Sequence, residues 1–196
     1  MVARLVASVV FILVAQQATA QFWDPLALEA DPASATAPLA PALTGLSDLH
    51  HPVTTRNAAS QQFFDQGLRL LYGFNHSEAV RAFKEAARLD PGNAMAWWGV
   101  AYALGPNLNL PMTPEANGPA WDAAQKAMAL RANASPAERA YIEAIATRYA
   151  SPAPADRAPL ERAFADAMRD LAARYPGDPD AAVLYWVGCA ASYDDR

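Results

Sequence analysis

The chain has 196 residues and is 53% hydrophobic, with 16 prolines, 9 glycines and a single cysteine. One cysteine cannot form an internal disulfide, so packing alone must stabilise the fold. The formal net charge is −5, and the basic residues lie beside acidic ones. No positive stripe is left for phosphates, which argues against nucleic acid as a partner.

Residues 1–20 have the pattern of a signal peptide. Arg4 supplies a positive start, Leu5 to Ala15 form an apolar run, and Ala18-Thr19-Ala20 offers small residues for cleavage. The apolar run is roughly half as long as a membrane-spanning helix requires. We therefore expect cleavage after Ala20, export to the periplasm or the medium, and no integral membrane span in the mature protein.

Residues 21–55 form a predicted extended lead. The stretch from Asp31 to Thr44 consists mostly of Ala, Pro, Ser and Thr, which cannot build a core. The preceding stretch is more apolar and contains Phe22 and Trp23. It either stays free or lies back on the folded domain.

From residue 56 onward no alternating strand pattern occurs, so residues 56–196 are predicted to form one all-α domain. Asn75 followed by Glu78, and Ser135-Pro136 followed by Glu138, predict capping boxes at two helix starts. The loop 107–118 is long for a helical array, and loops of this length are either functional or mobile. The expected helices span residues 57–72, 76–89, 94–104, 119–131, 136–149, 156–174 and a last segment that starts near 180.

The stretch 63–98 has the spacing of one antiparallel helix pair and the start of a second. Two small residues, Gly67 and Ala79, allow close approach of two backbones, and Phe83 fills the space between neighbouring pairs. Trp97 lies 34 residues after Phe63, which is the period of the repeat. The positions that define the pattern are Phe63, Gly67, Leu70, Ala79, Phe83, Ala86, Pro91 and Trp97.

This pattern resembles the tetratricopeptide repeat family. The resemblance implies antiparallel helical hairpins that stack as a right-handed α-solenoid, a scaffold that binds a protein or peptide and catalyses nothing. The signature residues become sparse after residue 98, so a non-repeating helical bundle with one repeat-like hairpin is the alternative fold.

The longer stretch from Phe63 to Met112 resembles an exported bacterial subfamily of these proteins that has no established activity. Members of that subfamily are longer than this chain, so we expect the repeat domain to be truncated at its C-terminus. Leu184, Trp186 and Val187 would then lack a covering helix, which makes self-association through the last helix a further expectation.

In such an array the first helix of each pair lines the concave face. The repeat register therefore predicts an aromatic and largely uncharged groove, which suits an apolar segment or helix as guest. The alternative is that the lead, through Phe22 and Trp23, or a later repeat fills this face, so that the same residues are core. The predicted groove residues are Gln61, Phe64, Leu68, Leu71, Tyr72, Met95, Trp98 and Tyr102.

The alternative function is a metal-binding protein or a metal-dependent exported enzyme. It would use His50, His51 and His76, with Asp65 or Glu78 as a carboxylate ligand. The competing interpretation of His76 is a residue that helps to fix the hairpin turn. The sequence has no Gly-x-Ser-x-Gly motif and no glycine-rich phosphate loop, and we predict neither catalytic residues nor a cofactor.

Overall fold

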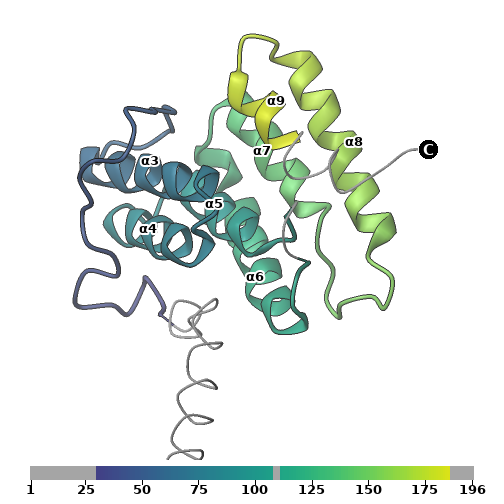
Figure 1. Ribbon diagram of the computed structural model, residues 1–196, viewed down its shortest axis with the longest axis horizontal. Coiled ribbons are helices and arrows are strands. Elements are labelled where there is room, and N and C mark those ends of the chain that lie inside the picture. The colour runs from purple at the N-terminus through teal and green to yellow at the C-terminus, as the bar shows by residue number, and fades with distance from the viewer. Residues whose placement is uncertain (1–29, 108–110, 186–196) are drawn as a thin grey trace, which may run out of the picture.

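The computed structural model describes residues 30–107 and 111–185. Over these residues the chain is all-α, as predicted, with no β-strand (Figure 1). None of the helices in this part of the chain is long and apolar enough to cross a membrane. The expectations about the signal peptide, Phe22, Trp23, Trp186 and Val187 concern residues outside the described ranges.

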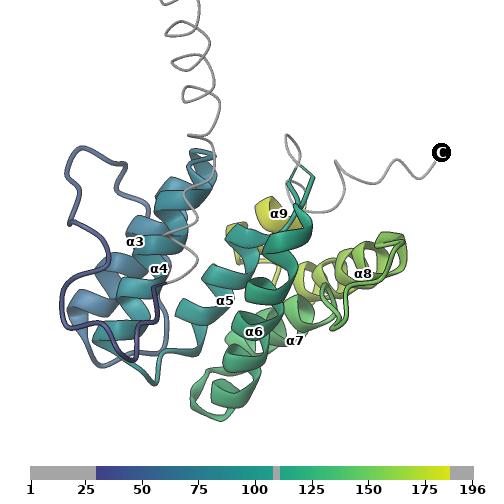
Figure 2. The same cartoon turned by 90° about the horizontal axis from the view of Figure 1, so that it is seen from below.

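Consecutive helices pack against each other, and α5 also contacts α3 and α7 (Figures 1 and 2). At the start of α3, the Asn57 side chain donates a 2.8 Å hydrogen bond to the carbonyl of Leu89 at the end of α4, so the two helices are antiparallel. The helices are α3 (Ala58–Tyr72), α4 (His76–Leu89), α5 (Ala94–Leu104), α6 (Pro114–Leu130), a 3-10 turn η1 (Arg131–Asn133), α7 (Pro136–Ala146), α8 (Ala158–Arg174) and α9 (Pro179–Tyr185).

Polar side chains start several of these helices. Asn57 caps α3 and Asn93 caps α5 through their side-chain oxygens. The predicted capping box of Ser135 and Glu138 is confirmed at the start of α7. The capping box predicted at Asn75 is wrong, because the Asn75 side chain makes no hydrogen bond to the first turn of α4.

The prediction for α6 is also wrong at its start. The helix begins at Pro114 after Thr113, five residues before the expected start at Pro119. Pro114 and Pro119 are equally suited to a first helical position, since neither has an N–H to donate. Pro119 instead lies inside the helix, and the predicted loop 107–118 is correspondingly shorter.

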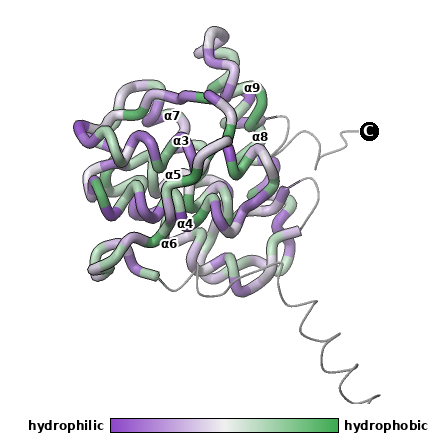
Figure 3. The backbone as a smooth tube through the Cα atoms, turned by 60° about the vertical axis from the view of Figure 1, so that its left-hand side comes forward, coloured by the Kyte–Doolittle hydropathy of each residue, from purple (hydrophilic) through white to green (hydrophobic). Residues whose placement is uncertain are grey.

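Helix α5 lies at the centre of the molecule, and all of its residues except Trp97 are buried. Most other helices have hydrophobic and hydrophilic residues interleaved at helical spacing, which gives each a core side and a solvent side (Figure 3). The ring of Phe83 from α4 fills the space between α3 and α5. A Cβ added to Gly67 would lie 2.6 Å from Phe83 Cδ1, and a Cβ added to Gly99 would lie 2.5 Å from the same atom.

The lead is not a free tether over its described part. The Leu39 N–H donates to the Glu85 carboxylate of α4, and the Leu43 N–H donates to the side chain of Gln66 in α3, each at 2.9 Å. Residues 39–43 therefore lie along the first helix pair, and the lead ends at Asn57, the capping residue of α3.

Candidate functional site

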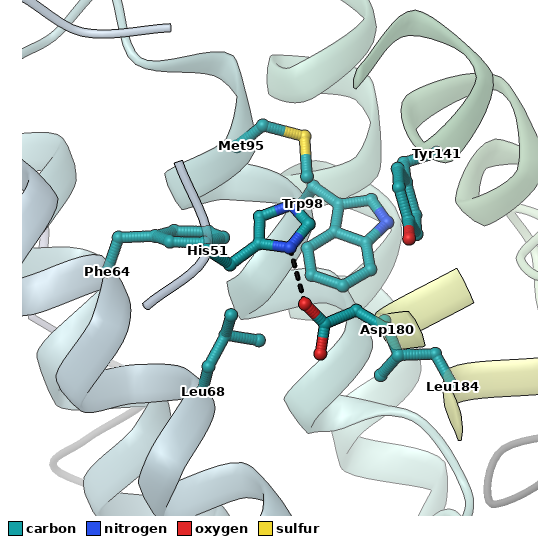
Figure 4. Close-up of a pocket in the computed structure, with 8 residues that line it drawn as sticks. All are labelled: His51, Phe64, Leu68, Met95, Trp98, Tyr141, Asp180 and Leu184. Atoms are coloured by element: carbon teal, nitrogen blue, oxygen red, sulfur yellow. Dashed lines mark hydrogen bonds and ion pairs between the residues drawn. The ribbon is translucent and has the colours of Figure 1, made fainter. Parts of the chain in front are cut away.

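Residues of α3, α5 and α7 line one pocket, which His51 of the lead and α9 close; the surface that these three helices present to it is called the concave face below. Phe64 and Leu68 of α3 and Met95 and Trp98 of α5 all point into one pocket (Figure 4). The lining side chains leave no room for a water molecule between them. The complete lining consists of His51, Phe64, Leu68, Met95, Trp98, Tyr141, Asp180 and Leu184.

Helix α9 occupies this face in the way a guest helix would. Leu184 is only 2% exposed and lines the pocket. The Tyr102 hydroxyl donates a 3.0 Å hydrogen bond to the Leu184 carbonyl, and the Tyr72 hydroxyl donates to Asp180 Oδ1 at 2.7 Å. Six of the eight residues predicted for the groove therefore face the covering segments, and Leu184 is covered. These six are Phe64, Leu68, Tyr72, Met95, Trp98 and Tyr102. Of the two interpretations of this face, the structure agrees with the one in which a later part of the chain fills it.

His51 is held over the pocket from the lead. Its backbone N–H donates to Asp65 Oδ1 at 3.1 Å, and its carbonyl accepts from the Gln61 side chain at 2.9 Å. Its ring lies 6.1 Å from the ring of Phe64 and meets Tyr141 edge-on at 6.0 Å. These contacts fix the ring with Nδ1 toward α9.

Two aspartates at the start of α9 complete the polar part of the site. Asp180 Oδ2 lies 2.6 Å from His51 Nδ1. Asp178 accepts hydrogen bonds at Oδ1 from the backbone N–H groups of Asp180 and Ala181, and at Oδ2 from the Tyr141 hydroxyl at 2.8 Å. The carboxylates are therefore oriented both by the helix start and by tyrosines from the concave face.

The electrostatics favour an ion pair at this point. Burial lowers the pKa of His51, but the hydrogen bond and charge of Asp180, together with the charges of Asp178 and Glu138, outweigh it and raise the pKa above 6.5. The hydrogen bond from His51 holds the pKa of Asp180 below 3.8.

The two tyrosine hydroxyls remain proton donors. Burial raises the pKa of Tyr72 and of Tyr141, and the adjacent carboxylates of Asp180 and Asp178 raise it further. Both hydroxyls are therefore neutral at physiological pH and hold the carboxylates by donated hydrogen bonds.

The three histidines named from the sequence do not form one site. His50 is mostly exposed and pairs with Asp65 at 2.7 Å. His76 lies at the start of α4 beside Phe74, and burial lowers its pKa. Within residues 30–107 and 111–185, the one cluster of potential metal ligands combines His51 with two aspartates that the sequence did not suggest.

Asp178 and Asp180 could not be recognised as partners of His51 from local pattern. His51 and Asp180 are 129 residues apart, and the stretch Asp178-Pro179-Asp180 has the appearance of an ordinary helix boundary. The adjacent pair of histidines was the only usable signal, and it marked one ligand of the cluster.

No protein-family model, no curated protein and no solved structure matches this chain. Its function is therefore inferred from the concave face and the His–Asp cluster at its edge.

Proposed function

We propose that this protein is an exported, tetratricopeptide-like scaffold without catalytic activity, which binds a protein or peptide along its concave face. In this proposal the helix pairs α3–α4, α5–α6 and α7–α8 are successive repeats of a right-handed α-solenoid. Export rests on the signal-peptide pattern of residues 1–20.

The arrangement of the first helices supports a repeat array. At their starts, the Asn93 side chain of α5 donates to Ser60 of α3 at 3.0 Å. At their ends, the Tyr149 hydroxyl, just beyond α7, donates to the Ala101 carbonyl of α5 at 2.6 Å. Helices α3, α5 and α7 thus share one direction and one face, as the first helices of stacked hairpins do.

The observation that carries the proposal is the seating of α9 in that face. A short helix places one aliphatic side chain, Leu184, against Phe64, Leu68, Met95 and Trp98. Four residues earlier, Asp180 binds Tyr72 and His51. This is the helix-in-groove mode of recognition, carried out within one chain.

The bound segment indicates the chemistry of an external guest. It would be a short helix with a carboxylate near its start and an aliphatic residue one turn later, because Asp180 and Leu184 have that spacing. Such a guest must displace α9, so the measured affinity is reduced by the fraction of molecules in which the face is open.

A labelled peptide of residues 177–185, titrated into the full chain and followed by fluorescence anisotropy, tests the proposal. Leu184→Ala removes the anchoring side chain of α9, and a buried Leu→Ala change costs about 2–5 kcal/mol. Because 1.4 kcal/mol corresponds to a factor of ten, the peptide should bind this variant at least about tenfold more tightly than the unaltered chain.

Val183→Ala is the matched control, since Val183 is on the same helix but 42% exposed. It should leave the peptide affinity unchanged, and circular dichroism should show native helicity in both variants. Equal affinity of the Leu184→Ala variant and the unaltered chain, or no binding to either, would contradict a guest site on the concave face. Trp98→Ala is unsuitable as a test because Trp98 is buried core.

A further inference from the structure

Three potential metal ligands from two distant segments meet at the edge of the concave face. One nitrogen of His51 and one oxygen each of Asp178 and Asp180 lie within 4.8 Å of one another. Ligand atoms around a tetrahedral ion with bonds of about 2.0–2.1 Å lie roughly 3.3 Å apart. Displacements below about 1 Å in each side chain would bring the three atoms to that separation.

The donor set selects the kind of ion. One imidazole nitrogen with two carboxylate oxygens suits divalent first-row ions such as Zn²⁺ or Mn²⁺. Ca²⁺ requires six to eight oxygen ligands, which these residues do not supply. We propose that His51, Asp178 and Asp180 bind one Zn²⁺ or Mn²⁺ ion. This proposal does not rest on guest binding at the concave face.

The surroundings already orient these ligands. The Tyr141 hydroxyl donates to Asp178 Oδ2 and the Tyr72 hydroxyl donates to Asp180 Oδ1. Hydrogen bonds of this kind hold metal-binding carboxylates in position and raise affinity. Each carboxylate oxygen has two lone-pair directions, so the oxygens that accept one hydrogen bond from tyrosine, Asp178 Oδ2 and Asp180 Oδ1, can still face an ion.

The local charge favours a bound cation, and the cluster is partly exposed to solvent. Asp178, Asp180 and Glu138 all act on His51 as negative charges. The side chains of His51 and Asp180 are 15% and 14% exposed, so an ion can reach the site from solvent. On binding, the ion displaces a proton from the His51 ring, which is released to solvent.

The bound ion would connect the lead to the α8–α9 turn. His51 lies before α3, whereas Asp178 and Asp180 lie at the start of α9. His51 and Asp180 are 129 residues apart in the sequence. An ion that binds only this folded arrangement raises the melting temperature, and the rise grows with the logarithm of the ion concentration once that concentration exceeds the Kd.

The test uses the full chain, purified without a histidine tag and stripped with EDTA. A Cys189→Ser background removes the one thiol that could bind zinc elsewhere. Isothermal titration with Zn²⁺, and separately with Mn²⁺, should give one equivalent per chain and a raised melting temperature. Ca²⁺ at the same concentration should give neither.

Asp178→Asn is the decisive variant because the amide oxygen can still accept the N–H groups at the start of α9. Changing a group that only hydrogen-bonds to a metal ligand weakens metal binding by about 10–100-fold, so losing this direct ligand should weaken binding at least about tenfold. Asp180→Asn should do the same and provides a second measurement if the first variant fails to fold by circular dichroism.

His50→Gln and His76→Gln are the matched controls, since neither residue belongs to the cluster. Both should bind the ion with unchanged affinity. The proposal is overturned if the unaltered chain takes up no Zn²⁺ or Mn²⁺, if folded Asp178→Asn and Asp180→Asn variants bind normally, or if His50→Gln abolishes binding.

Discussion

The contact of Phe83 with two glycines allows a sharp test of the core. The Phe83 ring is fully buried between α3 and α5. Truncation of a buried phenylalanine to alanine costs about 3–5 kcal/mol. For a domain of this size, each 1 kcal/mol corresponds to roughly 2–4 °C, so Phe83→Ala should lower the melting temperature by about 6–20 °C.

Gly67→Ala has an effect whose sign depends on Phe83. With Phe83 present the new methyl would lie 2.6 Å from Phe83 Cδ1, and the ring has little room to retreat because it also packs closely on Gly99, where an added Cβ would lie 2.5 Å from the same atom. Overpacking of this kind costs about 1–3 kcal/mol. Replacing glycine by alanine inside a helix returns about 1 kcal/mol, which leaves a net destabilisation of about 1 kcal/mol.

In the Phe83→Ala background the obstruction is gone, so Gly67→Ala should stabilise the protein by up to about 1 kcal/mol. The two changes are therefore coupled by about 2 kcal/mol, within the range for residues in contact. Urea unfolding of the four proteins, followed by circular dichroism at 222 nm, measures this coupling. Additive effects would refute the packing of Phe83 against Gly67.

Two further predictions concern charged groups. Arg148→Met should cost about 1–3 kcal/mol in urea unfolding. The fully buried Arg148 binds Glu161 at 3.0 Å and the Pro106 carbonyl at 2.9 Å, and its removal leaves Glu161 paired with Arg157 but takes the donor from Pro106. The second is a pH dependence in which two histidines act in opposite directions. The stability from the raised pKa of His51 is complete below pH 6.5 and is lost as the pH rises through the folded value, while Asp180, with a lowered pKa, loses its share only below pH 3.8. His76 has a lowered pKa and so destabilises the fold as the pH falls below 6.5. As the pH rises from about 6 to about 8, the melting temperature should therefore fall in His76→Gln, where only the His51 effect remains, and rise in His51→Gln, where only the His76 effect remains.

Local chemistry made much of the fold predictable. The bounds of α4 and α5 agree with the expected 76–89 and 94–104, because a glycine-containing turn and an Asp-Pro-Gly-Asn stretch interrupt the apolar pattern. The Ser135 capping box was predictable for the same reason, since it depends on residues three positions apart. Where two local signals compete, as Pro114 and Pro119 do in α6, the sequence does not decide between them.

The site was only partly predictable because it depends on where helices far apart in sequence meet. The repeat register correctly groups Phe64, Leu68, Met95 and Trp98 on one face, since helical spacing alone determines it. It does not reveal that α9 crosses that face, which depends on how the later helix pairs stack. The partnership of His51 with two aspartates follows from that crossing.

The two proposals concern one structural element and are therefore thermodynamically linked. A metal ion on His51, Asp178 and Asp180 requires α9 to remain docked on the lead, whereas a guest on the concave face requires Leu184 to leave it. Each ligand thus favours a different position of α9, and an ion that stabilises the docked position must weaken guest binding. By reciprocity, the guest weakens metal binding by the same factor. This makes the His51–Asp180 contact the point at which ion occupancy and access to the concave face would be coupled.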